Sequence, residues 1–138
     1  MVDKDRILQR LGRLDPLLQL LDEVQGRGRD LYLSDLDTRL RAERALQLAL
    51  QITIDVGAHI VSELGLPPPR DYRGVFASLR DGGVIEGELG GRLGDAAGLR
   101  NLLVHGYAEL DDLQVWDALG RLEDLQAFAA AAVAASER

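Results

Sequence analysis

One stretch decides the fold: residues 34–69, which read SDLDTRLRAERALQLALQITIDVGAHIVSELGLPPP. Ser34 followed by Asp37 is typical of a helix start, with an acceptor side chain and an acid in the first turn. Gly65 and the prolines at 67–69 stop a helix. Between them, apolar residues recur at helical spacing for about eight turns. We therefore predict the longest helix here, as the spine of a bundle. Its apolar stripe comprises Leu36, Leu40, Ala45, Leu48, Ile52, Val56, Ile60 and Leu64.

Helical spacing of apolar residues continues on the N-terminal side of this spine. A first amphipathic helix is marked from Ile7 to Leu21 and is ended by Gly26 and Gly28. Pro16 lies inside it, after an aspartate, so the helix either is kinked there or begins again.

Three further helices are expected after the prolines. A short one covers Tyr72–Arg80, a glycine-rich one Ile85–Val104, and the last about Asp112–Ala135 with Asp112 as its cap. No convincing run of alternating β-branched residues indicates a strand. The pattern predicts an all-α antiparallel bundle of four to five helices.

The expected helix over residues 85–104 is unusual in its glycine content. Each interior glycine costs about 1 kcal/mol relative to alanine, so this helix would be marginal alone. Tertiary packing must hold it, through close approach of a neighbour to its backbone. The glycines are Gly87, Gly90, Gly91, Gly94 and Gly98.

Composition bounds the class of protein. The 138 residues, 46% hydrophobic and 28% charged, suit one globular domain over residues 1–138. Cysteine is absent, which excludes disulfides and thiolate metal sites and fits a cytoplasmic location. The N-terminus lacks a signal-peptide pattern and no stretch approaches the ~18 apolar residues of a membrane span, so no membrane association is expected.

Charge limits the way in which the chain can contact nucleic acid. The formal net charge is −7, and Lys4 is the sole lysine among 16 basic residues. Such a chain gains little from general attraction to phosphates. Any RNA contact must come from a local arginine cluster or from a partner, and the acidity also permits pairing with a basic protein.

The chemistry of the chain gathers in the run GLRNLLVHGY, residues 98–107. It holds Arg100, Asn101, His105 and Tyr107 within about two helical turns. On a straight helix Asn101 and His105 share a face, whereas Arg100 and His105 point about 140° apart. Two arrangements would bring them together. Either Gly106 ends the helix and lets the chain turn back, or two copies of the protein share each site.

These residue types suit RNA cleavage without a metal ion or cofactor. An imidazole titrates near neutral pH, so His105 can take a proton from a ribose 2′-hydroxyl or give one to the departing 5′-oxygen. The planar fork of Arg100 matches a phosphate and stabilises charge in the transition state. Asn101 can orient the imidazole or a phosphate oxygen, and Tyr107 can hydrogen-bond the scissile group. Histidines and acids show no metal-ligand spacing. On spacing alone, a plainer alternative is that His105 and Tyr107 cap a helix end and Arg100 forms an ion pair.

The spacing Arg-X4-His-X-Tyr resembles the motif of the HepT family of HEPN ribonucleases. The resemblance extends over roughly Asp30 to Phe128, and the N-terminal helix fits the family only in pattern. Pro16 in that first helix and the glycine-rich helix are departures from the family. Supporting segments occur in the expected order: Glu43–Ala49, Ile54–Ile60, Glu63-Leu64-Gly65, Tyr72-Arg73 and Gly83-Val84-Ile85.

The resemblance implies a toxin of a toxin–antitoxin system, a homodimeric HEPN-type bundle that cleaves RNA in a cleft shared by two motifs. It implies catalytic roles for Arg100, Asn101, His105 and Tyr107, and no metal or cofactor. The implied antitoxin is a small nucleotidyltransferase, MNT, which in some members adds AMP to the motif tyrosine, here Tyr107. An anionic group beside Arg100 would occupy the phosphate site and repel RNA. Two other functions stay open: an interaction module regulated by modification of Tyr107, and a purely structural helical dimer.

Other chemistry-bearing residues have plainer interpretations. His59 is expected in the core or an interface, and Asp55, four residues earlier, could pair with it. Trp116 is expected as a core or dimer anchor. The arginines at 39, 41 and 44 alternate with acids, which is typical of a solvated helix face rather than a substrate track.

Overall fold

The computed structural model describes residues 3–138, and all their side chains except that of Tyr107. This part of the chain forms seven α-helices and one 3-10 turn, so the all-α prediction is confirmed. The expected number, four to five helices, is too low because the connection after α1 forms a short helix and the expected last helix is divided into two. The elements are α1 Lys4–Gly26, α2 Arg29–Ser34, α3 Leu36–Glu63, α4 Tyr72–Asp81, α5 Gly87–His105, η1 Tyr107–Glu109, α6 Asp112–Leu119 and α7 Leu122–Ser136.

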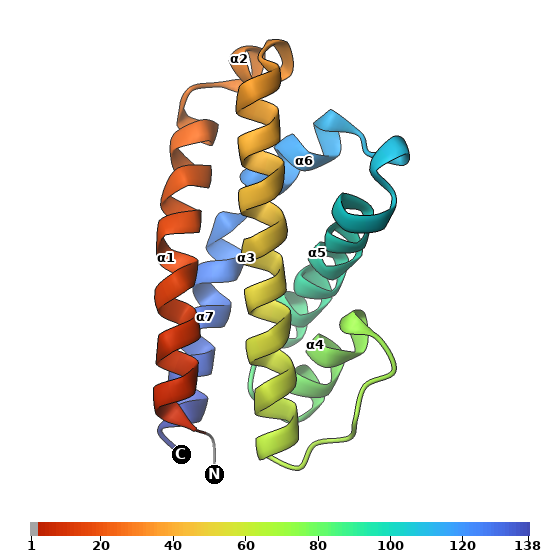
Figure 1. The fold of residues 1–138 in the computed structure, drawn as a ribbon. Coiled ribbons are helices and arrows are strands. Elements are labelled where there is room, and N and C mark those ends of the chain that lie inside the picture. Colours follow the sequence, from red (N-terminus) through yellow and green to blue (C-terminus); the bar gives the residue numbers. More distant parts are fainter. Residues whose placement is uncertain (1–2) are drawn as a thin grey trace.

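The long helix α3 is the spine, as predicted. It runs beside α1 along the length of the molecule, with α7 behind and α4 and α5 on its other side (Figure 1). Its cap is Asp35 and not Ser34, because the Asp35 carboxylate accepts from the Thr38 N–H at 3.3 Å. Gly65 follows the helix with φ +66°, a left-handed conformation that suits glycine.

The two ends of α3 differ in how deeply they are buried. Leu36 and Leu40, expected in the core stripe, are 56% and 44% exposed. At that end the buried side chains are instead Thr38, Ala42 and Glu43, and the expected stripe is buried from Ala45 onward only in part. A helix of 28 residues is about 42 Å long and extends past the elements that cover its middle.

Helix α3 also comes closer to a membrane span than the sequence pattern suggested. Within residues 3–138 it alone has the length and hydropathy for such a span. However, 56% of its most apolar window is buried inside the fold. That degree of burial is typical of a core helix.

Before the spine, α1 continues through Pro16 without beginning again. It ends at Gly26, and Gly28, with φ +100°, turns the chain into the unexpected short helix α2. This helix places Tyr32 in the core, with its ring 5.5 Å from that of Trp116. Trp116 therefore serves as a half-buried core contact.

Helices α4 and α5 pack closely, and two glycines of α5 explain how. A Cβ on Gly90 would lie 3.1 Å from Arg80 Cβ, and one on Gly94 would lie 3.1 Å from Arg73 Cγ. The arginine side chains of α4 thus lie across the bare backbone of α5. The expected close approach of a neighbour to this glycine-rich helix is confirmed at these two positions.

The expected last helix is divided into α6 and α7. The break falls at Gly120 and Arg121, whose backbone N–H groups close turns onto residues 117 and 118. The cap of α6 is Asp111, one residue before the expected Asp112, and it accepts from the Leu113 N–H at 2.9 Å. At the far end, Ala132 and Ala135 of α7 are buried in the core.

Candidate functional site

The C-terminal half of α5 carries the predicted motif, and the helix ends at its histidine. Gly106 caps α5 and its N–H donates to the Leu102 carbonyl at 3.0 Å. The chain then enters the 3-10 turn Tyr107–Glu109, where the Glu109 N–H donates to the Gly106 carbonyl at 2.8 Å. The expectation that Gly106 ends the helix is confirmed.

Arg100 is half-buried and is held by three helices. Its Nε donates to Gln51 Oε1 of α3 at 2.6 Å, and its Nη1 donates to Asn101 Oδ1 at 3.2 Å. Its guanidinium carbon lies 5.1 Å from the centre of the Tyr72 ring at the start of α4. The plainer interpretation of Arg100 as an ion-paired residue is wrong for the side chains that the structure describes, because these partners are neutral.

The Gln51 amide has a second partner on α3. Its Nε2 donates to Asp55 Oδ1 at 2.8 Å, four residues further along the helix. Sequence reasoning missed Gln51 and Tyr72 as site residues. The only signal for Tyr72 was its place in a segment that resembles the HepT family, and Gln51 had none.

The other predicted site residues are placed differently. Asn101 is exposed and beside Arg100, whereas His105 is exposed at the helix end. Among the described side chains, no hydrogen bond or ion pair joins His105 to Arg100. The side chain of Tyr107 lies outside the described part of the structure, although its backbone opens the 3-10 turn. One copy of the chain therefore brings Arg100 and Asn101 together but does not pair them with His105.

His59 lies on α3, with its side chain 15% exposed and its Nε2 3.9 Å from Glu63 Oε1. The Asp55 carboxylate is hydrogen-bonded to Gln51. The pairing considered between Asp55 and His59 is thus replaced by two separate contacts. Arg39, expected on a solvated face, is instead 19% exposed and donates to the Leu33 carbonyl at 2.7 Å.

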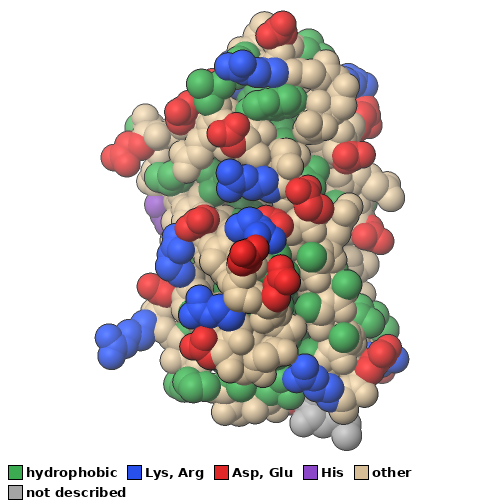
Figure 2. All heavy atoms as spheres, turned by 180° about the vertical axis from the view of Figure 1, so that it is seen from behind, with side chains coloured by type: hydrophobic (Ala, Val, Ile, Leu, Met, Phe, Trp, Pro, Cys, Tyr) green, Lys and Arg blue, Asp and Glu red, His purple; other side chains and the backbone are tan. Residues whose placement is uncertain are grey.

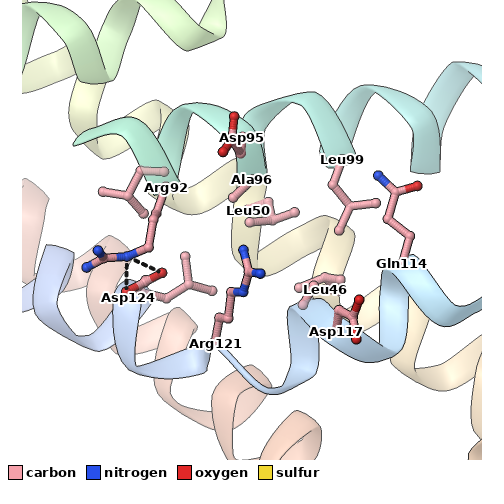
Figure 3. Close-up of a pocket in the computed structure, with 13 residues that line it drawn as sticks. Leu46, Leu50, Arg92, Asp95, Ala96, Leu99, Gln114, Asp117, Arg121 and Asp124 are labelled. Atoms are coloured by element: carbon pink, nitrogen blue, oxygen red, sulfur yellow. Dashed lines mark hydrogen bonds and ion pairs between the residues drawn. The ribbon is translucent and has the colours of Figure 1, made fainter. Parts of the chain in front are cut away.

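A cavity of about 200 Å³ lies between α3, α5, α6 and α7, apart from the motif residues (Figure 3). Arg92 Nε crosses it to Asp124 Oδ1 at 3.0 Å, and Arg121 also lines it. Asp95 and Asp117 complete the charged lining. Three acids against two arginines do not favour a nucleic-acid phosphate here.

On the side of the molecule seen in Figure 2, the described residues form no broad basic face for RNA. Figure 2 shows one side of the molecule, on which blue and red side chains are interspersed. Some of them are paired, such as Arg73 with Asp95 at 2.8 Å. Within residues 3–138 no group of three or more His, Asp or Glu side chains is placed to hold a metal ion.

Comparison with known proteins gives a consistent result. The profile of the family described as ribonuclease HepT-like matches residues 8–132. The tRNA nuclease HepT of Aphanizomenon flos-aquae is 34% identical over 110 residues, covering 80% of this chain and 75% of that protein. The mRNA nuclease HepT of Shewanella oneidensis is 28% identical over 125 residues, covering 90% and 93%.

A solved structure extends the likeness to the whole fold. The tri-AMPylated HEPN toxin of Shewanella oneidensis, in complex with its MNT antitoxin, superposes with a TM-score of 0.84. It is 26% identical, and the match covers 95% of this chain and 97% of that one.

Proposed function

The chain belongs to the ribonuclease HepT-like family, and from that premise we propose that it cleaves RNA with Arg100 and His105. As a HepT nuclease it is the toxin of a toxin–antitoxin pair. We place it in the cytoplasm, as one HEPN domain over residues 1–138, with RNA as its substrate.

The observation that carries this proposal is the way in which Arg100 is held. A half-buried guanidinium rests on Gln51, Asn101 and Tyr72, and none of the three neutralises its charge. Among the described side chains Nη2 has no hydrogen-bond partner, so this edge is available to a phosphate oxygen. On a chain with net charge −7, one such cation is the local attraction that RNA binding needs.

The proposed reaction is an internal transfer of the phosphodiester. A histidine takes the proton from the ribose 2′-hydroxyl, whose oxygen attacks the phosphorus, and the bond to the 5′-oxygen breaks. The departing oxygen takes a proton from an acid, which leaves a 2′,3′-cyclic phosphate and a 5′-hydroxyl end. Arg100 stabilises the charge that develops on the phosphate oxygens, and Asn101 and Tyr107 orient the scissile group. The reaction draws on no metal ion.

We infer that the working form is a homodimer. The two proton transfers need a base and an acid, and a second copy would supply a second His105. It would also offer an imidazole to the Arg100 of its partner, because among the described residues this arginine has no hydrogen bond or ion pair with His105 of its own chain. The shared site thereby doubles a sparse positive charge.

We further propose that an MNT-type nucleotidyltransferase is the antitoxin and that it adds AMP to Tyr107. The support is the Shewanella toxin, which is AMPylated and bound to its MNT antitoxin. Tyr107 follows the end of α5, seven residues after Arg100. A phosphate attached there would occupy the anion position beside this arginine.

Purified wild type and His105→Ala, incubated with total RNA in EDTA, test the proposal. We expect wild type to leave 2′,3′-cyclic phosphate and 5′-hydroxyl ends, and the variant to lose cleavage by about 100-fold or more. Equal cleavage by both proteins would rule out this mechanism. Intact mass after incubation with an MNT-type nucleotidyltransferase and ATP tests the AMP site, with Tyr107→Phe as the control. AMP addition to a protein that never cuts RNA would favour the interaction module instead.

A further inference from the structure

Gln51 differs from the other partners of arginine in this part of the fold. On α4 and α5, the arginines at 73, 80 and 92 each have a carboxylate partner in the described structure, at 2.8, 3.1 and 3.0 Å. Arg100 has instead the amide oxygen of Gln51, at 2.6 Å from its Nε. An amide orients a guanidinium without cancelling its charge. A carboxylate in the same place would compete with a phosphate for it.

The orientation of the Gln51 amide is fixed by a third residue. Asp55 Oδ1 accepts a hydrogen bond from Gln51 Nε2 at 2.8 Å. An ionised carboxylate only accepts, so the NH₂ end of the amide must face Asp55 and the carbonyl end must face Arg100. Asp55 and Gln51 lie one turn apart on α3, a rigid helix, so their relative positions are set by the backbone. The negative charge of Asp55 is kept one side chain away from the guanidinium.

The bond to Gln51 also selects which edge of Arg100 stays available. It occupies Nε, the nitrogen nearest the backbone, while Asn101 takes one hydrogen of Nη1. The guanidinium carbon lies over the ring of Tyr72, 5.1 Å from its centre. What remains is the terminal edge with Nη2, which can donate to phosphate oxygens.

We propose that Gln51 is a positioning residue for RNA cleavage, holding the guanidinium of Arg100 for the phosphate, with Asp55 fixing the amide. The inference rests on the proposed function of Arg100. It adds a residue that lies outside the Arg-X4-His-X-Tyr motif and on a different helix.

Gln51→Leu tests this role, because leucine keeps much of the side-chain volume and removes the acceptor. Gln47→Leu is the matched control: Gln47 lies one turn earlier on α3, is half-buried, and has no hydrogen bond among the described side chains. Misplacement of a catalytic group by about 1 Å costs up to about 100-fold in rate. We expect kcat to fall about 10- to 100-fold in Gln51→Leu, with KM changed less than about threefold, and no change in Gln47→Leu.

The Nε–H signal of Arg100 in a ¹H–¹⁵N spectrum reports on the hydrogen bond to Gln51 and does not depend on catalytic activity. The signal is assigned by its loss in Arg100→Lys. We expect its hydrogen exchange to be at least about tenfold faster in Gln51→Leu and unchanged in Gln47→Leu, because only the first substitution removes its acceptor. In the Arg100→Lys background, Gln51→Leu should slow cleavage no further, since lysine has no Nε–H to position.

These outcomes separate the inference from the proposed function. If Arg100→Lys slows cleavage but Gln51→Leu changes neither kcat nor Nε–H exchange, the role of Gln51 is overturned and the catalytic arginine stands. If Gln51→Leu slows cleavage equally with and without Arg100, Gln51 does not act through it, and the inference fails. If Arg100→Lys cleaves at the wild-type rate, the proposed site fails, and the positioning role fails with it. Circular dichroism of each variant checks that the helical fold is retained.

Discussion

The guanidinium carbon of Arg100, near the end of α5, lies 5.1 Å from the centre of the Tyr72 ring, the first residue of α4. At this separation the electron-rich face of the ring attracts the cation. The contact joins two helices at the proposed phosphate site. It also means that α4, which carries none of the motif residues, takes part in placing the arginine.

The ring face of Tyr72, and not its hydroxyl, should support RNA binding. A cation–π contact at a partly exposed site is worth about 0.5–1 kcal/mol. We therefore expect Tyr72→Leu to weaken affinity for a non-cleavable, 2′-deoxy-substituted RNA by about two- to fivefold. Tyr72→Phe should bind as wild type does. Fluorescence anisotropy titrations measure both, and equal losses in the two variants would argue against the ring and for the hydroxyl.

The close packing of α3 on α4 should depend on Gly57. A Cβ at this position would lie 2.9 Å from Val75 Cγ1 and 3.3 Å from Leu79 Cδ1. Gly57→Ala should therefore lower the free energy of unfolding by about 1–3 kcal/mol, as overpacking does elsewhere. Urea denaturation followed by circular dichroism gives the value.

The control for that measurement is Gly91→Ala on α5. A Cβ there has nothing within 4 Å. Alanine should then raise the free energy of unfolding by up to about 1 kcal/mol through its helix propensity. Opposite signs at the two glycines are the expected result, and a stabilising Gly57→Ala would show that α4 moves aside without cost.

Arg39 should be a structural link and not part of an RNA track. Its Nη1 donates to the Leu33 carbonyl at 2.7 Å, near the end of α2, and its Nε lies 3.5 Å from Asp112 Oδ2 of α6. Removing it leaves a helix-end carbonyl without its donor. Arg39→Ala should cost about 1–3 kcal/mol of stability.

Arg41 is the matched control, because it carries the same charge on the same helix but is exposed, with no hydrogen bond among the described residues. Arg41→Ala should change the free energy of unfolding by less than about 0.5 kcal/mol. Thermal or urea unfolding of the pair separates the two roles. If both substitutions leave stability intact and both weaken RNA binding, the arginines of α3 contact the substrate after all.

The sequence alone was enough to predict those elements whose caps, glycines and apolar spacing all lie within their own segment. The spine, its stop at Gly65, the short helix from Tyr72 and the end of α5 at Gly106 follow from caps, glycines and spacing within each segment. The helix α2 and the break between α6 and α7 could not be predicted from such local signals. Each is a local turn stabilised by packing, such as that of Tyr32 on Trp116, which no single segment encodes.

The candidate site likewise contains residues that the sequence identifies and a residue that only the fold reveals. The motif names Arg100 and Asn101 as members of one site, and the two side chains are in contact, although helical spacing had placed Asn101 on the face of His105. Gln51 lies 49 residues before Arg100, and its contact depends on how α3 and α5 are rotated against each other. That rotation is set by the whole core and not by any one pattern. A glutamine in a helix is ordinary, so only the folded chain singles it out.

The bare backbone at Gly94 has a consequence for how mutations in this protein will behave. Arg73 lies against that glycine and is the immediate neighbour of Tyr72. A methyl group at residue 94 would lie 3.1 Å from Cγ and Nη1 of Arg73, so this side chain, which is paired with Asp95, would have to shift. A larger side chain at this glycine would thus alter the contact between α4 and α5 while every motif residue stays in place, so a survey of the motif alone would miss the change.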